Sequence, residues 1–128
     1  MKKALLSIIL ILLITITLTG CKKELPKVVN IIQYEVGGEK VVNKKIITDQ
    51  EIIKKIGDYI NDMKPLSESE MVDLVIPREI VITYNDIAIN IAKQEKTHCN
   101  YANSTKKIDS LAKLPYGLYE LVLDILKR

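Results

Sequence analysis

The most regular pattern in this chain is an alternation of apolar and polar residues in residues 78–84 and 87–93. Successive side chains of a β-strand point to opposite faces of a sheet, so this period predicts two half-buried strands. Asn85-Asp86 lies between them and suits a two-residue turn. The sequence therefore predicts a β-hairpin whose facing apolar pairs are Tyr84 with Ile87, Ile82 with Ile89, and Ile80 with Ile91.

An amphipathic helix is predicted between Thr48 and Pro65. Thr48-Asp49-Gln50-Glu51 has the form of a capping box, S/T-x-x-E, with Thr48 as the capping residue. The apolar residues that follow recur at helical spacing and are Ile52, Ile53, Ile56, Tyr59, Ile60 and Met63. Gly57 lies at the margin of this apolar stripe, where it weakens a helix. We expect it to allow close packing of this helix on the sheet.

A second hairpin is predicted around Gly37-Gly38, because both central positions of a type I′ turn need positive φ. Its strands are residues 28–36 and 39–47. The expected pairs are Val36 with Glu39, Tyr34 with Val41, Ile32 with Asn43, and Glu35 with Lys40. Val28, Ile32, Tyr34 and Val36 then share the apolar side of the first strand. Asn43-Lys44-Lys45 makes its partner half polar, which predicts an edge strand.

The remaining segments are less regular. Residues 65–77 are expected to form a solvated loop, whose acids Glu68, Glu70 and Asp73 match no calcium-binding loop. Residues 97–102 predict a further strand, after the two hairpins, whose register is open by one residue. Residues 106–113 fit either a short strand or an irregular return. The closing helix follows Pro115-Tyr116-Gly117, and its apolar face is Leu118, Leu121, Val122, Ile125 and Leu126.

Together these elements predict an α+β fold. We expect an antiparallel sheet of about four to five strands, with one amphipathic helix packed on it and a C-terminal helix. The chain has no Trp and no Phe, so its core is built mainly from Ile, Leu and Val. Such residues favour sheets. Residues 28–128 are long enough for one domain and not for two.

The N-terminal segment resembles a bacterial lipoprotein signal peptide. A basic Met1-Lys2-Lys3 precedes an apolar stretch, residues 4–17, which would rise only about 21 Å as a helix and is too short for a permanent span. The stretch ends in Leu18-Thr19-Gly20-Cys21, which resembles a lipobox (Leu, small, small, Cys). The resemblance implies that Cys21 takes a diacylglycerol and becomes the mature N-terminus once residues 1–20 are removed.

Two acyl chains give stable anchoring, whereas one binds only marginally. Residues 21–27 would then be the lipidated cysteine and a short polar tether. We therefore expect the domain on the extracytoplasmic face of the cell membrane, with the membrane as its first partner.

The layout also resembles small lipoproteins of Gram-positive bacteria that are grouped as domains of unknown function. Ile47-Thr48-Asp49-Gln50-Glu51-Ile52 matches an "IT-D-x-E-I" stretch of these proteins. Leu114-Pro115-Tyr116-Gly117-Leu118-Tyr119 is similar to their "PYxGxY" segment, with one residue fewer before the glycine. In size and architecture the chain also resembles lantibiotic immunity lipoproteins, which keep a producer's toxin from its membrane.

No catalytic constellation is recognisable, and we expect no catalytic residue, no metal and no cofactor. His98 is the one histidine, and a dyad with Cys99 is disfavoured because neighbours on a strand point to opposite faces. A hydrolase would need His98 to meet a distant acid or serine. With Cys21 acylated, Cys99 has no partner for an intramolecular disulfide. Its thiol is either buried or available for an intermolecular bond.

The function that we expect is binding without catalysis. The net charge of +3 includes Lys2 and Lys3, so the mature domain is too balanced for nucleic acid. The expected partner is a peptide or an envelope protein, with a recognition patch of Tyr101, Tyr116 and Tyr119. One alternative is an accessory subunit of a membrane complex, docked through Tyr119 and Leu123 of the C-terminal helix. Another is an immunity-type lipoprotein that sequesters a peptide.

Overall fold

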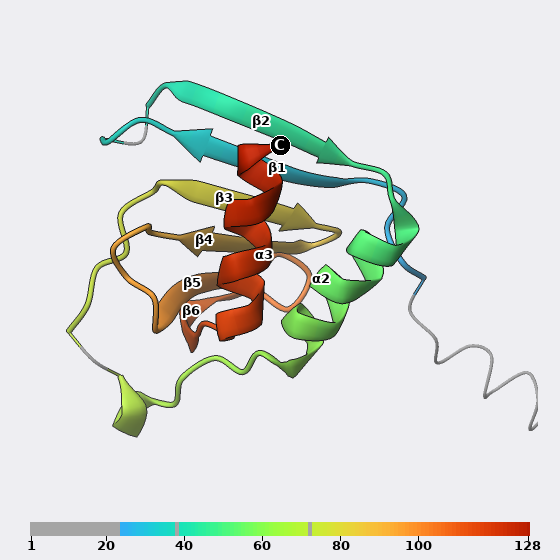
Figure 1. Ribbon diagram of the computed structural model, residues 1–128. Coiled ribbons are helices and arrows are strands. Elements are labelled where there is room, and N and C mark those ends of the chain that lie inside the picture. The colour runs from blue at the N-terminus through green and yellow to red at the C-terminus, as the bar shows by residue number, and fades with distance from the viewer. Residues whose placement is uncertain (1–23, 38, 72) are drawn as a thin grey trace, which may run out of the picture.

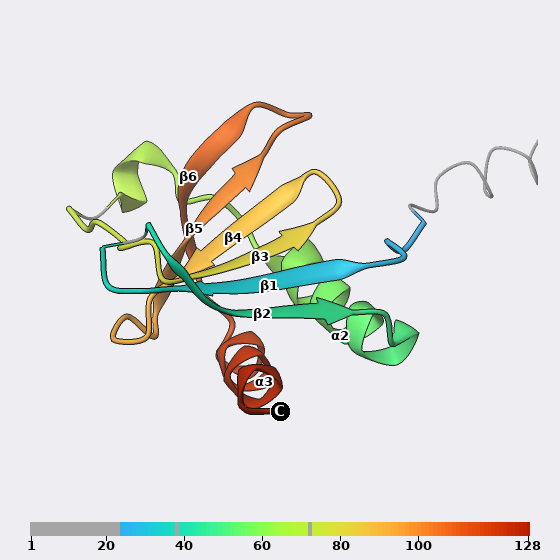
Figure 2. The same cartoon turned by 90° about the horizontal axis from the view of Figure 1, so that it is seen from above.

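The computed structural model describes residues 24–37, 39–71 and 73–128, and within them six strands form one antiparallel sheet (Figure 1). The strand order is β2-β1-β3-β4-β5-β6. Two helices, α2 (Gln50–Asp62) and α3 (Tyr116–Lys127), lie on the same face of the sheet, as Figure 2 shows. The strands are β1 (Val29–Tyr34), β2 (Val41–Ile47), β3 (Ile80–Tyr84), β4 (Ile87–Ile91), β5 (His98–Asn103) and β6 (Ile108–Lys113).

This architecture confirms the predicted α+β fold with an antiparallel sheet and a C-terminal helix. The sixth strand, β6, is the segment that the sequence left open between a strand and an irregular return. The predicted signal peptide and the lipobox, Leu18-Thr19-Gly20-Cys21, lie outside the described residues, and so does Gly38 of the predicted turn.

The β3–β4 hairpin has the predicted register. Tyr84 lies opposite Ile87, and the two isoleucine pairs follow as expected. Asn85 adopts a φ of 51°, which places it in the left-handed region that asparagine tolerates in tight turns. All six paired side chains are buried, so this hairpin defines the helix-covered face of the sheet, which we call the inner face.

The side of β1 that faces the core is not the side predicted from the sequence. Val29 and Ile31 are fully buried on the inner face, whereas Val36 is 97 % exposed. The predicted apolar side, with Val28, Ile32 and Tyr34, is therefore on the outer face. The reason is that β1 is apolar on both sides, so alternation alone does not choose between them. Pairing of Ile31 with Ile82 of β3 decides the orientation.

The β1–β2 register is irregular. The predicted pair of Tyr34 with Val41 is present, and the Glu35 amide donates to the Lys40 carbonyl at 2.8 Å. A β-bulge between Gln33 and Tyr34 then shifts the pairing, so Asn43 lies opposite Gln33 and the predicted pairing with Ile32 is wrong. An extra residue on one strand reverses which side chains point inward. β2 is an edge strand, as predicted.

Helix α2 begins one residue later than the capping box suggests. Asp49, and not Thr48, is the N-cap, and its Oδ1 accepts from the amides of Glu51 at 2.9 Å and Ile52 at 3.4 Å. The Asp49 carboxylate thus binds two of the amides that have no partner in the first turn. The predicted apolar stripe is confirmed, because Ile53, Ile56, Ile60 and Met63 are buried.

Two glycines set how closely the helices pack. A Cβ on Gly57 would lie 3.0 Å from Cζ of Tyr84 and closer still to its hydroxyl, so α2 approaches β3 as expected. A Cβ on Gly117 of α3 would lie 2.6 Å from Cζ of Tyr59 on α2. Each glycine therefore leaves room for a tyrosine ring.

Helix α3 is part of the core. Leu118, Tyr119, Val122 and Ile125 are buried, and Leu123 is half-buried against the same cluster. The Asn43 amide donates to the Leu126 carbonyl at 3.0 Å, which holds the end of α3 to the edge strand. Burial on both sides explains why this helix is more widely apolar than a surface helix.

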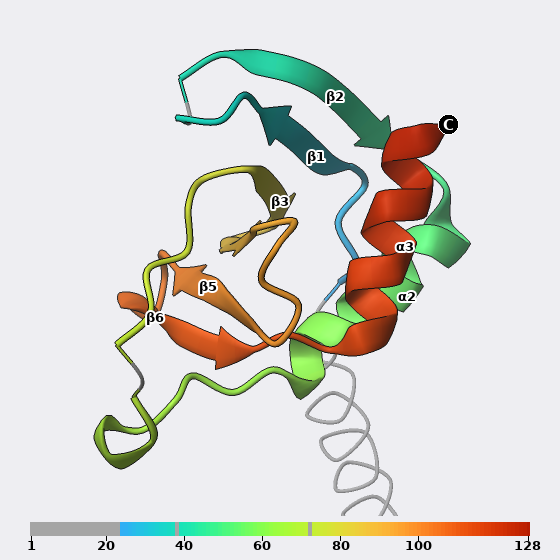
Figure 3. The same cartoon turned by 60° about the vertical axis from the view of Figure 1, so that its left-hand side comes forward.

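The segment between α2 and β3 is not simply a solvated loop. It contains a short 3₁₀ turn, η1 (Glu68–Glu70), and passes along β6 to the outer face of the sheet, as Figure 3 shows. Ile76, with Leu66 and Leu74, packs there against Ala92 and Leu111. This second, smaller cluster covers part of the outer face.

Replacing Gly57 with alanine should destabilise the protein. A methyl group would overlap the Tyr84 ring, and overpacking of this kind costs about 1–3 kcal/mol, which exceeds the roughly 1 kcal/mol that alanine gains in a helix. Urea unfolding of G57A measures the change. In a Tyr84→Phe background, which lacks the nearest atom, the cost should shrink. A stabilised G57A protein would contradict the proposed close packing.

Candidate functional site

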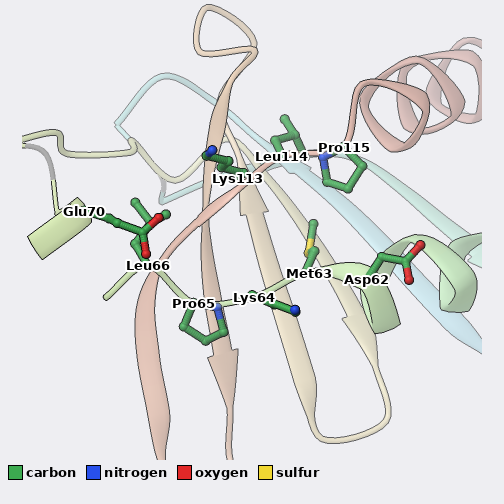
Figure 4. Close-up of a pocket in the computed structure, with 9 residues that line it drawn as sticks. All are labelled: Asp62, Met63, Lys64, Pro65, Leu66, Glu70, Lys113, Leu114 and Pro115. Carbon is green, nitrogen blue, oxygen red and sulfur yellow. The ribbon is translucent and has the colours of Figure 1, made fainter. Parts of the chain in front are cut away.

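A pocket of about 430 Å³ lies where α2 ends, β6 ends and α3 begins (Figure 4). Its volume falls in the range of sites for small ligands, about 300–1,000 Å³. The apolar lining is Met63, Pro65, Leu66, Leu114 and Pro115. The charged lining is Asp62, Lys64, Glu70 and Lys113, all exposed.

Backbone contacts fix the walls of this pocket. Pro65 forms an isolated bridge with Ala112, and the Leu66 amide donates to the Leu111 carbonyl at 2.8 Å. The segment after α2 is thereby held against the edge strand β6. The Leu114 amide donates to the Thr97 carbonyl at 2.9 Å, which fixes the chain just before α3. Met63 and Leu114 are buried residues of the main core, so the core itself forms part of the pocket wall.

Glu70 is the charged group of the pocket with the most defined position. The Ser67 hydroxyl donates to its Oε1 at 2.7 Å, and the Ser67 amide does so at 3.4 Å. These hydrogen bonds, helped by the charge of Lys113, hold the pKa of Glu70 below its usual value. In Figure 4, Glu70 lies beside Leu66, on the far side of the pocket from Asp62.

The two lysines of the pocket are available to bind a ligand. Neither Lys64 nor Lys113 forms a salt bridge with another residue of the described ranges. The pocket therefore combines an apolar lining with a fixed carboxylate and two ammonium groups. Such a combination suits a ligand with both apolar and charged parts, and a short peptide segment has both.

The three tyrosines proposed as a recognition patch are not brought together at the surface. Tyr101 and Tyr119 are core residues, 8 % and 4 % exposed, whereas Tyr116 is 71 % exposed. The Tyr119 hydroxyl donates to the Lys93 carbonyl at 2.7 Å and so fixes the β4–β5 connection to α3. Burial is the main cause that raises the pKa of Tyr119. The burial of Tyr119 also removes the docking surface expected around Tyr119 and Leu123.

His98 and Cys99 point to opposite faces of β5, as expected. Cys99 is fully buried on the inner face, and burial raises the pKa of its thiol to about 12. Of the two alternatives for this thiol, the structure shows the buried one. His98 is half-buried on the outer face, where its Nδ1 lies 2.8 Å from the Thr97 hydroxyl. Glu95 accepts from both the amide and the hydroxyl of Thr97, which lowers the pKa of Glu95.

The outer face of the sheet carries a polar group that the sequence did not single out. Asn90 donates from Nδ2 to the Pro77 carbonyl at 3.2 Å, while its Oδ1 is buried without a partner among the described residues. Asn100 lies opposite Asn90 on β5. Period-two alternation placed Asn90 on this face, but nothing in the sequence showed that residues 76–77 cover it.

Apolar side chains are also exposed near the β2 edge. Within β2, Ile46 is 60 % exposed, and Val41 and Val42 are about half exposed. Lys44 lies between them and Ile46 along the strand. Lysines on an edge strand discourage pairing with other chains.

The described residues contain neither a membrane-spanning helix nor a metal-binding cluster. No helix in these ranges is long and apolar enough to cross a membrane. No three His, Cys, Asp or Glu side chains in the same ranges gather closely enough to hold a metal ion.

Comparisons with protein-family models, with curated proteins and with solved structures found no match to this chain. The pocket and the surfaces described above are therefore the basis for any functional argument.

The Cys99 thiol should be unreactive in the folded protein. In a Cys21→Ala chain Cys99 is the one cysteine, so a thiol reagent such as DTNB reports on it alone. Because burial keeps the thiol protonated and covered, labelling at pH 8 should be at least a hundredfold slower than in urea. Rapid labelling without denaturant would contradict the buried position.

The same pKa shift predicts a loss of stability at high pH. A thiol whose pKa is raised by folding stabilises the protein fully below its unfolded pKa, about 8.5. This contribution is lost as the pH rises from there towards 12. The free energy of unfolding should therefore fall more steeply above pH 9 in the parent than in Cys99→Ala, as urea titrations at pH 8 and pH 10 would show. An equal fall of the unfolding free energy in the two proteins would contradict a stabilising contribution from the protonated Cys99 thiol.

Proposed function

We propose that this chain is a lipid-anchored binding module of the extracytoplasmic membrane face that holds a peptide or a segment of an envelope protein. The observation that carries the binding role is the pocket between α2, β6 and α3, with its apolar lining and its fixed charges. The lipobox Leu18-Thr19-Gly20-Cys21 supports the anchor. In this proposal the protein acts by capture and performs no chemical step.

The chemistry of the pocket supports binding over catalysis. A nucleophilic site needs a nucleophile and a base within hydrogen-bond reach. The pocket lining contains neither histidine, cysteine, serine nor tyrosine. Glu70 is held in its ionised form by Ser67, so it is suited to accept hydrogen bonds and not to exchange protons near neutral pH.

The charges of the pocket favour a peptide ligand. Lys64 and Lys113 can bind a carboxylate, and Glu70 can bind an ammonium group, while Met63 and Leu114 contact apolar side chains. Capture of a peptide toxin, as in immunity-type lipoproteins, is a specific version of this function.

A second candidate function is that of an accessory subunit of a membrane complex. The exposed apolar side chains of β2, chiefly Ile46, favour it. The contact would then be made by the outer face of the sheet near β2, because the main apolar face of the C-terminal helix is buried against the core.

The anchor is tested by Cys21→Ala. Without the thiol no diacylglycerol can be attached, so the protein should move from the membrane fraction to the soluble fraction or remain unprocessed. Fractionation with detection by antibody, together with incorporation of a labelled fatty acid, measures this. Cys99→Ala is the matched control and should keep both the label and the membrane location. Labelling of the Cys21→Ala protein would contradict the anchor.

The pocket is tested by site-specific crosslinking in the living bacterium. A benzophenone amino acid at position 64 lies in the pocket, whereas the same group at the exposed position 55 of α2 does not. One defined adduct should form from position 64, and Lys113→Glu should reduce it several-fold. Adducts that are identical from both positions, or that ignore Lys113→Glu, would contradict binding in this pocket.

A further inference from the structure

The described chain enters the domain at one particular end of the sheet. Glu24 and Leu25 line a small cavity of about 60 Å³ together with Asn85, Asp86 and Ile87 of the β3–β4 hairpin. Figures 1 and 2 show that β1 starts at the end of the sheet that carries the β3–β4 and β5–β6 turns. The β1–β2 turn lies at the opposite end. We call these the entry end and the far end.

The link from Cys21 to this end is short. Only residues 22–24 separate Cys21 from Leu25, and the four residue steps between them span at most about 13–14 Å. Pro26 is already buried on the domain, and Val29 is fully buried. Within the expected tether, residues 21–27, the chain is therefore already packed on the domain at Pro26. A lipid on Cys21 would therefore hold the entry end close to the surface of the bilayer.

We propose that the entry end faces the membrane and that residues 104–107, the β5–β6 turn, bind anionic lipid headgroups. This inference rests on the proposed lipid anchor. The turn is fixed to the β3–β4 turn, because the Ser104 amide donates to the Asp86 carbonyl at 2.9 Å. The Lys106 amide donates to Oδ1 of the buried Asn103 at 3.0 Å. All four turn residues are exposed, so a rigid turn presents them outward.

The charges of the turn suit phosphate groups. Lys106 and Lys107 form no salt bridge with another described residue. Lys107 has a φ of 54°, in the left-handed region that favours glycine. The backbone conformation therefore does not favour a lysine at this position. The sequence just before β1 also carries Lys22, Lys23 and Lys27. The carboxylates that belong to the entry end among the described residues are Glu24, Asp86 and Asp109. Lysines near an anionic surface are attracted to it.

This orientation also directs the Lys113 side of the pocket away from the membrane. β6 runs from the turn to Lys113, and its length places Lys113 about 17 Å farther from the bilayer if the strand stands upright. The proposed peptide site would then be open to ligands that arrive from outside the cell.

The test uses tryptophan as a depth reporter, because the chain contains none. Thr105→Trp reports on the turn, and Val36→Trp, at a site that is 97 % exposed, reports on the far end. The lipidated full chain of each variant is reconstituted into phosphatidylglycerol vesicles that contain brominated lipid, and quenching is measured. Quenching at position 105 should exceed that at position 36 at least threefold. Equal or reversed quenching would overturn the orientation.

A charge-reversed variant tests the headgroup contact itself. Lys106→Glu with Lys107→Glu should lower quenching at position 105 at least twofold, whereas Lys40→Glu, just before β2, with Lys44→Glu in β2 should not change it. Unchanged quenching in the first variant, or equal quenching in phosphatidylcholine vesicles, would overturn anionic headgroup binding. A chain that fails to stay on the vesicles contradicts the anchor instead, so the two failures are distinguishable.

Discussion

The burial of one isoleucine-rich sheet face under two helices is the interaction on which the rest of the structure depends. Ile53, Ile56 and Ile60 of α2 pack on the inner face defined by the β3–β4 hairpin, and α3 completes the same cluster. Each fully buried aliphatic side chain contributes about 1.5–3 kcal/mol. The described part of the chain contains no disulfide to supplement this core. The end of α2 and the start of α3 are fixed by this packing, and the pocket lies between them.

The parts of the fold that the sequence predicted correctly are those with a single consistent pattern. The β3–β4 register followed from strict alternation on both sides of Asn85-Asp86, and the apolar stripe of α2 from its helical spacing. β1 is apolar on both sides, so its inner side could not be chosen without knowing that it pairs with β3. The sequence left β6 open between a strand and an irregular return, because Ser110 and Ala112 of its inner side are polar or small, which weakens the alternation.

The candidate site depends on contacts that are distant in sequence, and this is why it could not be predicted. Residues 62–66, Glu70 and residues 113–115 meet only because Pro65 and Leu66 pair with β6. The sequence did place His98 and Cys99 on opposite faces, since that follows from strand geometry. The sequence made Tyr101, Tyr116 and Tyr119 candidates for a recognition patch, because tyrosines suit both cores and interfaces. Tyr101 and Tyr119 are buried in the core.

The most direct test of the account is the intact mass of the mature protein extracted from bacterial membranes, combined with N-terminal peptide mapping. We expect a chain that begins at Cys21 and carries a diacylglycerol on that residue. A chain that keeps Met1, or one that begins elsewhere with an unmodified Cys21, would contradict the anchor. It would also remove the reason for the entry end of the sheet to face the bilayer.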